Sequence, residues 1–294
     1  MFIVKYKSFF IGLSVALVVI SLIAINTVGL KKGIDFTGGT VIEIAYASTT
    51  PDVLNIAGLK DLDAKVYELS EGKYKIISSI DYEILTQKLI PLLSVNKTYP
   101  YSETQVSTVG PSLGKEMTQK AMIAITLVVL AILAFIAFAF RAVSLPVSSW
   151  KYGVIAMITL LHDIIIPAGV YVWLGTMFGA EVDTLFVIAL LTVMGISISD
   201  KIVVFDRIRE NLKAHAKAKG EEFARVVGKS LEQTFTRSVM TSMTVIIALF
   251  ALYLYGPEAT NNFAITLIVG MIVGTYSSIF VASPLLVVIE SRQK

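Results

Sequence analysis

Six long apolar runs are the feature that most constrains this sequence. Each approaches or exceeds the roughly 20 apolar residues that a helix needs to cross the hydrocarbon core of a bilayer. The runs are residues 9–30, 121–140, 152–174, 184–205, 239–255 and 263–289. Only 16% of the residues are charged, compared with about 25% in ordinary soluble domains. We therefore predict a polytopic α-helical membrane protein with six transmembrane helices.

The first apolar run follows Lys5 and Lys7, as the apolar part of a secretory signal peptide follows basic residues. It is longer than the roughly 7–15 apolar residues of such a signal, and no convincing Ala-x-Ala cleavage site follows it. We interpret it as an uncleaved first transmembrane helix.

The distribution of Lys and Arg over the short connections predicts the orientation of the helices. Basic residues occur in 141–151, in 207–237 and in the C-terminal tail, whereas 175–183 and 256–262 contain neither Lys nor Arg. Short cytoplasmic loops carry an excess of positive charge. We therefore predict that both termini are cytoplasmic and that the segment between the first two helices lies on the other side of the membrane.

That segment, residues 31–118, is typical of a small soluble domain. Strand patterns at 40–47, 64–69, 74–79 and 104–109 are combined with helix patterns at 51–59 and 81–93. The order β-α-β-β-α-β is that of a ferredoxin-like split βαβ unit. We predict three parts: residues 1–30 with the first helix, an extracytoplasmic α+β (ferredoxin-like) domain at 31–118, and a five-helix membrane domain at 119–294.

The basic segment near 207–237 is predicted to be helical twice. The fourth transmembrane helix continues to Lys219, and Gly220 ends it. Apolar residues then recur at helical spacing from Phe223 to Phe235, with basic residues between them. This pattern is typical of an amphipathic helix on an anionic membrane surface. A plain solvated connector is the alternative.

Two adjacent charges, Asp200 and Lys201, lie inside the fourth apolar run. A charge at mid-helix costs about 2.5–3.5 kcal/mol on insertion scales, and such residues commonly mark ion pathways. Apolar helical neighbours remove hydration from the Asp200 carboxylate. We predict that Asp200 couples ion movement to work; a carboxylate that only pairs with lysine or water is the alternative. Lys201 is expected to extend toward the cytoplasm.

Three further side chains are candidate members of an ion-coupling site. His162 and Asp163 lie in the middle of the third run, and Pro167 leaves the carbonyl of Asp163 without its helical donor. We interpret the pair as either a proton relay or a structural cluster that fixes helix packing. Arg237 opens the fifth run and is either a counter-ion to Asp200 or a positive anchor at the cytoplasmic surface.

Small residues recur every fourth position in the sixth run, at Gly270, Gly274, Ser278 and Ala282. Small residues at this spacing let helix backbones approach closely. We interpret the stripe as a packing device and expect Pro284 to kink the end of that helix.

Motifs of enzymes are absent from the sequence. It contains no Walker A, Gly-x-Ser-x-Gly or His-Glu-x-x-His motif, and no cysteine. We predict no catalytic residue, no cofactor, no metal site and no nucleic-acid partner.

Several motifs resemble the SecD/SecF family of export-accessory membrane proteins. The signatures shared by SecD and SecF stand at 33–40 (Gly-Ile-Asp-Phe-Thr-Gly-Gly-Thr) and at 109–116. Motifs that resemble SecF stand at 161–163, 195–211, 234–238 and 274–283. The block Asp-Arg-Ile-Arg-Glu-Asn at 206–211 is highly specific, and the resemblance covers nearly the whole chain.

The resemblance implies a subunit that pairs with SecD and works beside the SecYEG channel and the ATPase SecA in the bacterial cytoplasmic membrane. Such complexes draw on the proton (or sodium) motive force to complete translocation of preproteins. Each subunit supplies six spans, so the pair resembles a resistance-nodulation-division transporter split in two. By the same resemblance, Asp200 is the ion-coupling aspartate and Arg237 is its arginine in the fifth span. Ser199 and Lys201 depart from the family pattern, and the coupled ion is left open.

Two other functions compete with this reading. One is a half-size exporter of small molecules or lipids that assembles on itself. The other is a structural scaffold of a membrane complex without ion flux.

Overall fold

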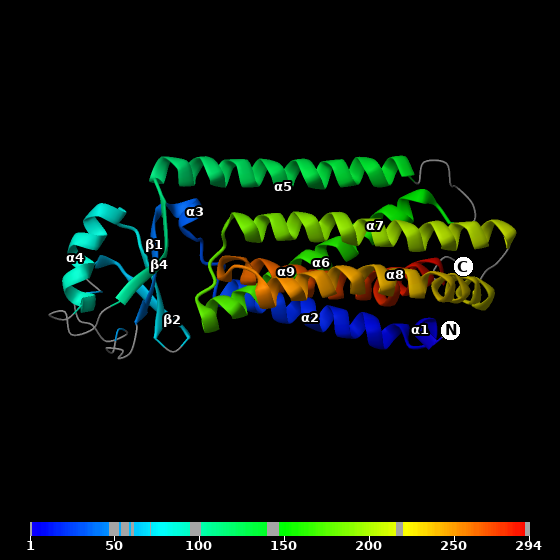
Figure 1. Cartoon of the computed structure of the whole chain (residues 1–294). Coiled ribbons are helices and arrows are strands. Elements are labelled where there is room, and N and C mark those ends of the chain that lie inside the picture. The colour runs from blue at the N-terminus through cyan, green and yellow to red at the C-terminus, as the bar shows by residue number, and fades with distance from the viewer. Residues whose placement is uncertain are drawn as a thin grey trace. The chain divides into compact units, whose positions relative to one another are not determined.

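The computed structural model describes residues 2–46, 53, 59, 62–70, 72–94, 101–139, 147–215 and 220–291 (Figure 1). The chain divides into two compact units. The first comprises Met1–Gly29, Ile125–Trp173 and Leu185–Lys294, and the second comprises Leu30–Ala124 and Leu174–Thr184. The first unit is helical, and the second contains the only sheet in the described part of the chain.

Six helical segments in the described residues are long and apolar enough to cross a membrane. Each coincides with one of the apolar runs, so the predicted six-helix membrane protein is confirmed. A short helix, α1 (Phe2–Lys5), precedes the first segment. The segments are α2 (Lys7–Thr27), α5 (Pro111–Ala139), α6 (Ser149–Phe178), α7 (Thr184–Ala214), α8 (Glu221–Tyr255) and a composite of α9 (Asn261–Ser277), η4 (Ser278–Ala282) and α10 (Ser283–Ser291).

The N-terminal half of α8 differs from the prediction. The helix is continuous from Glu221 to Tyr255, and no separate amphipathic helix precedes it. Its apolar residues Phe223, Val227 and Leu231 are buried in one cluster with Ile208 of α7. The surface-helix interpretation and the solvated-connector alternative are therefore both wrong, because protein covers the apolar stripe from Phe223 to Leu231; Phe235 alone is exposed. Residues 216–219, with the expected helix end at Lys219, lie outside the described residues.

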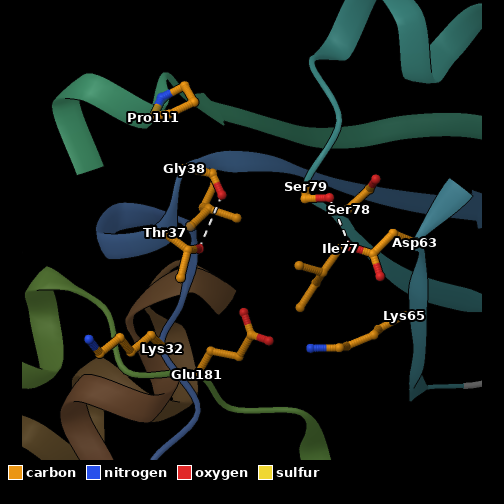
Figure 2. A pocket seen from close by; sticks show the side chains of 11 residues that line it. Lys32, Thr37, Gly38, Asp63, Lys65, Ile77, Ser78, Ser79, Pro111 and Glu181 are labelled. Carbon is orange, nitrogen blue, oxygen red and sulfur yellow. Dashed lines mark hydrogen bonds between the residues drawn. The ribbon is translucent and has the colours of Figure 1, made fainter. Parts of the chain in front are cut away.

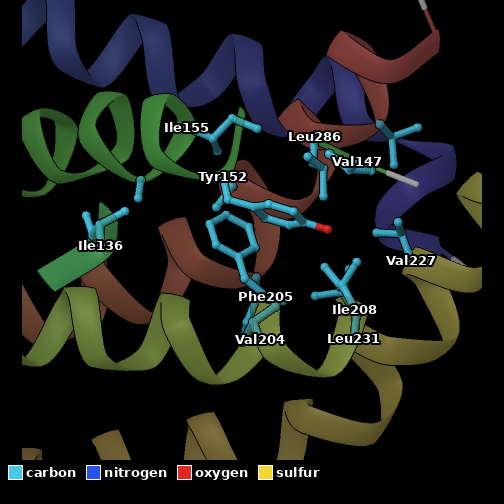
Figure 3. Packing of buried hydrophobic residues seen from close by; sticks show 14 of the residues in the cluster. Ile136, Val147, Tyr152, Ile155, Val204, Phe205, Ile208, Val227, Leu231 and Leu286 are labelled. Carbon is cyan, nitrogen blue, oxygen red and sulfur yellow. The ribbon is translucent and has the colours of Figure 1, made fainter. Parts of the chain in front are cut away.

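One aromatic pair marks the core of the helical unit. The rings of Tyr152 on α6 and Phe205 on α7 lie edge to face, with centroids 5.2 Å apart. Ile136 of α5, Leu231 of α8 and Leu286 of α10 belong to the same buried cluster (Figure 3). Helices α5, α6, α7, α8 and α10 thus contribute to one core.

The small-residue stripe of the sixth segment packs against α7, as expected. A Cβ atom on Gly270 would lie 2.2 Å from Cγ2 of Val193, and one on Gly274 would lie 3.2 Å from Cβ of Ser197. Backbone atoms of α9 therefore approach α7 more closely than any larger residue would permit.

The second unit contains a four-stranded antiparallel sheet with strand order β2-β3-β1-β4. Leu85, Leu89 and Leu93 of α4 (Tyr82–Ser94) are buried in one cluster with Ile42 and Ile76 of the sheet. This arrangement is consistent with the predicted ferredoxin-like order. Apart from residues 53 and 59, the predicted helix at 51–59 lies outside the described residues. The strands are β1 (Gly39–Tyr46), β2 (Lys65–Ser70), β3 (Lys73–Ser78) and β4 (Tyr101–Val109).

The loop between α6 and α7 belongs to this second unit. Val182 forms a parallel bridge with Lys32. Its N–H donates to the carbonyl of Lys31 (2.7 Å), and its carbonyl accepts from the N–H of Gly33 (2.8 Å). Nothing in the sequence predicted this pairing, which anchors the start of the Gly-Gly segment and of the short helix α3 (Ile34–Thr37).

Candidate functional site

A carboxylate from α6, Asp163, is the centre of a polar cluster inside the helical unit. Its side chain is fully buried. Oδ2 of Asp163 accepts hydrogen bonds from Ser197 Oγ and Lys201 Nζ of α7, and from Ser277 Oγ of α9 at 2.8 Å. Oδ1 lies 2.8 Å from Nδ1 of His162. Side chains from three helical segments therefore converge on one carboxylate.

Lys201 differs from the prediction. Its side chain is fully buried and forms an ion pair with Asp163. The expectation that it extends toward the cytoplasm is wrong, because α6 supplies a counter-charge inside the bundle. Ser197, one helical turn earlier, shares the same face of α7. A buried ammonium persists in low dielectric only when it is paired and hydrogen-bonded, as it is here.

His162 places an unsatisfied nitrogen beside this pair. Its side chain is 7% exposed. Nδ1 contacts Asp163, whereas Nε2 is buried and has no hydrogen-bond partner among the described residues. Because Nδ1 is engaged with Asp163, Nε2 is the ring nitrogen that is left for a further hydrogen bond.

Asp200 lies on a different face of α7 and has different partners. Its Oδ1 accepts a hydrogen bond from Ser238 Oγ of α8 at 2.6 Å, and its Oδ2 accepts one from Ser278 Oγ of η4. The side chain is partly buried. Two hydroxyl donors stabilise the ionised form, and a proton on the carboxylate would weaken both bonds.

Two consecutive serines at the junction of α9 and the π turn η4 contact the two carboxylates. Ser277, the last residue of α9, donates to Asp163, and Ser278, the first residue of η4, donates to Asp200. Pro284 has no N–H to donate to the carbonyl four residues earlier, so an ordinary α-helical ladder cannot pass through this region. Single π turns inside helices occur frequently at functional sites.

Arg237 does not contact Asp200 in this structure. Its side chain is exposed on α8 and lines a pocket of about 340 Å³ that also contains Asp206 and Glu210. The next residue, Ser238, makes the contact with Asp200 instead. The structure thus groups His162 with Asp163 and leaves Arg237 apart from both carboxylates. The role of Arg237 as a counter-ion stays a prediction.

Four serine hydroxyls of this cluster were not singled out as ligands from the sequence: Ser197, Ser238, Ser277 and Ser278. Ser278 had been placed in a packing stripe only. A hydroxyl inside an apolar run is a weak signal of a binding site, since most such hydroxyls donate to a carbonyl of their own helix. Which carboxylate each serine contacts is visible only in the assembled helices.

A second candidate site lies within the sheet-containing unit. A pocket of about 250 Å³ is lined by Lys65, Asp63 and Glu181, among others (Figure 2). Glu181 is 9% exposed. Burial raises the pKa of the Glu181 carboxyl, and nearby lysines, including Lys65, oppose that rise. In Figure 2 the side chains of Lys65 and Glu181 extend toward each other.

Gly38 lines this pocket, and the Gly38-Gly39 pair is required there for steric reasons. Gly38 and Gly39 have φ angles of +77° and +129°, which side chains rarely tolerate. A Cβ atom on Gly38 would lie 2.8 Å from Cα of Pro111, and one on Gly39 would lie 2.5 Å from the carbonyl oxygen of Ser78. The motif therefore allows close backbone contact between α3, β3 and the start of α5.

Metal ligands are not grouped in the described residues: no three His, Cys, Asp or Glu side chains lie close enough together to hold an ion.

Comparison with known proteins identifies the family. Residues 92–292 match the family model "Protein export membrane protein SecD/SecF, C-terminal", and residues 23–50 match the model "SecD/SecF GG Motif". The chain belongs to the SecF branch of the SecD/SecF family. This confirms the family that the sequence motifs predicted, and the multi-pass membrane architecture agrees with it.

Relatives of similar length support the assignment. The chain is 39% identical to protein translocase subunit SecF of Thermobaculum terrenum, over 99% of this chain and 94% of that protein. It is 37% identical to the protein of the same name from Anaerolinea thermophila, over 97% and 92% of the two chains.

Solved structures of SecDF have the same fold. The crystal structure of SecDF, a translocon-associated membrane protein from Thermus thermophilus, matches 98% of this chain with 30% identity and a TM-score of 0.82. A structure of SecDF in a super-membrane-facing form matches with 29% identity and a TM-score of 0.69. In both cases the chain spans only 38% of the length of the SecDF chain.

Proposed function

We propose that the chain is the SecF-type subunit of the Sec protein-export machinery and uses the proton motive force to promote preprotein translocation. The observation that carries the proposal is the pair of carboxylates inside the membrane bundle, Asp163 and Asp200. Two consecutive serines at the junction of α9 and η4 donate hydrogen bonds to them. Carboxylates at membrane depth are expensive and commonly mark proton or ion pathways.

The hydrogen bonds of Asp200 suggest how proton uptake changes the bundle. In the ionised state, Ser238 attaches α8 and Ser278 attaches η4 to the same carboxylate of α7. A proton on Asp200 removes the negative charge and weakens both charge-assisted bonds. α8 and η4 are then free to shift relative to α7. One charge that crosses 100 mV releases about 2.3 kcal/mol, enough to move such an equilibrium nearly fifty-fold.

Arg237 is the residue we propose to respond to this change. It is adjacent to Ser238, so a shift of α8 moves both residues together. Its exposed position beside Asp206 and Glu210 fits a cation that alternates between acidic partners. His162 and Asp163, on α6, complete the proposed ion-coupling site as the buried cluster that Ser277 joins to α9.

The proposed partners follow from the relatives. Because this chain spans 38% of a SecDF chain, we propose that a SecD subunit supplies the remaining part. The relatives' names refer to a translocase and a translocon. We therefore propose that the pair works beside SecYEG and SecA on translocating preproteins. The location is the bacterial cytoplasmic membrane, with both termini cytoplasmic, as the basic short loops indicate.

The test uses the chain reconstituted with SecD, SecYEG and SecA in vesicles that carry an imposed proton gradient. Asp200→Asn and Arg237→Met are each expected to abolish the stimulation of translocation by the gradient and the accompanying proton flux. ATP-driven translocation by SecA should persist in both. Glu116→Gln is the matched control, since this carboxylate is exposed on α5 and pairs with Lys120 at 2.8 Å. Wild-type stimulation and flux in both site variants would contradict the proposal.

A homo-oligomer without SecD that exports small molecules would support the half-size exporter instead. Normal export with no proton flux in the wild type would support the scaffold.

A further inference from the structure

We propose that Lys201 is a resident cation for Asp163, so that the intramembrane cluster takes up one coupling ion, at Asp200, instead of two. The role of Asp200 rests on the proposed function. The pairing of Lys201 with Asp163 rests on the geometry alone.

The first argument is that the Asp163 carboxylate is buried and already has its partners. Neither Asp163 nor Lys201 is exposed to any measurable extent. Lys201 Nζ donates to both Asp163 Oδ2 and Ser197 Oγ, and Ser277 Oγ donates to the same carboxylate oxygen. The ammonium therefore occupies the position at which this carboxylate would otherwise receive a proton or a metal cation.

The second argument is the direction of neighbouring side chains on α7. Ser197 and Lys201 are four residues apart and share one face, which contacts Asp163 of α6. Asp200 is about 100° away on the helix and contacts α8 and η4. Adjacent residues with opposite charge thus serve two different sites, and Lys201 does not neutralise Asp200 by direct contact.

The third argument is the charge count around the two carboxylates. Asp163 and Asp200 contribute two negative charges, and Lys201 contributes one positive charge. His162 contacts Asp163 through Nδ1, and Arg237 is exposed in a separate pocket. Lys151 and Glu290 pair with each other at 2.7 Å. With His162 neutral, the described cluster carries one uncompensated negative charge and accommodates one added cation.

The two carboxylates therefore have different roles. A charge buried in low dielectric must be compensated, because its hydration is lost. The Lys201 ammonium, which is covalently part of the chain, permanently balances the charge of Asp163. The charge of Asp200 is balanced reversibly, by a cation taken up from solution. Replacing Lys201 with an uncharged side chain would convert Asp163 into a second site that takes up a proton.

Infrared difference spectroscopy of the purified full-length chain in sodium-free buffer tests this inference, because the C=O stretch of a protonated carboxyl is separate from carboxylate bands. The measurement is made at about pH 7, which is near the ordinary pKa of histidine and far above that of carboxyls. At this pH, the spectrum of Lys201→Met should contain one more protonated-carboxyl band than that of the wild type. The gained band should be missing from the double variant Lys201→Met with Asp163→Asn. Absence of the gain in Lys201→Met, or its persistence in the double variant, would overturn the inference.

A second measurement does not require that Lys201→Met fold. In a pH titration, the protonation signal that Asp200→Asn removes should be the same in the wild type and in the charge-neutral double variant. Loss of that signal in Asp163→Asn would mean that Asp163 itself titrates, and the inference would fail. Neither spectrum depends on export, so an absence of proton flux in the reconstituted complex would contradict the proposed function without altering this result.

Discussion

Ser277 and Ser278 are neighbours in the chain, yet their hydroxyls bind carboxylates of two different helices. Ser277 reaches Asp163 of α6 and Ser278 reaches Asp200 of α7. Consecutive helical residues point about 100° apart, so one segment can contact both helices when it lies between them. A displacement of the junction between α9 and η4 therefore changes the hydrogen bonds of both carboxylates at once.

Ser278→Ala should reduce gradient-driven translocation about tenfold. The substitution removes one hydrogen bond to a charged acceptor, which is worth about 1.5–3 kcal/mol, and it disconnects η4 from Asp200. Translocation by the reconstituted complex with and without a proton gradient measures the effect. Ser283→Ala is the matched control: Ser283 is also buried near η4, but its hydroxyl donates only to the carbonyl of Ser278 at 3.4 Å. Equal effects of the two substitutions would contradict a specific role for Ser278.

The ion pair between Lys201 and Asp163 should show strong coupling in a double-mutant cycle. Lys201→Met and Asp163→Asn should each lower the free energy of unfolding by about 3–5 kcal/mol. Asp163→Asn leaves the buried Lys201 ammonium without its partner, and Lys201→Met forces the buried Asp163 carboxylate to take up a proton. The double variant should be more stable than either single variant. Denaturant titration in detergent micelles measures all three. Losses that simply add would show that the two side chains do not stabilise each other.

Gly270→Ala should destabilise the helical unit. The added Cβ atom would lie 2.2 Å from Cγ2 of Val193, and overpacking of this kind costs about 1–3 kcal/mol. Gly195→Ala is the matched control, because nothing lies within 4 Å of a Cβ atom at that helical position. Thermal unfolding of both variants in the same detergent checks the comparison. A midpoint for Gly270→Ala at or above that of Gly195→Ala would contradict the close packing of α9 on α7.

Glu181→Gln should weaken the pH dependence of stability in mildly acidic solution. Burial raises the pKa of Glu181 above its ordinary value of 4.5, so the folded state binds a proton that the unfolded state has lost. Its contribution to stability is fully present below about pH 4.5 and decreases as the pH rises through the raised pKa. The thermal midpoint of the wild type should therefore fall more steeply over this window than that of the variant.

Glu83→Gln is the control for this experiment, since Glu83 is exposed on α4. Parallel pH profiles for Glu181→Gln and wild type would show that Glu181 titrates as an exposed carboxyl does.

The membrane architecture could be predicted from the sequence because it depends on local composition. A run of about 20 apolar residues has few alternatives to a spanning helix, and all six runs are long apolar helices in the structure. The strands at 40–47, 64–69, 74–79 and 104–109 were also found close to their observed bounds, since alternation and turn residues are local signals too. Asp200 and Asp163 were identified by the same logic, as charges in an apolar environment.

The partners of these charges depended on contacts between helices, which no local pattern encodes. The sequence placed Lys201 beside Asp200, and only the assembly of α6 against α7 paired it with Asp163. The apolar stripe of 223–235 matched a surface helix in pattern, but its residues from Phe223 to Leu231 are buried in one cluster with α7, and only Phe235 is exposed. Likewise, a serine in an apolar run usually bonds to its own backbone. The tertiary structure decided which serines bind carboxylates, because a hydrogen bond needs atoms within about 3 Å and only packed helices bring them there.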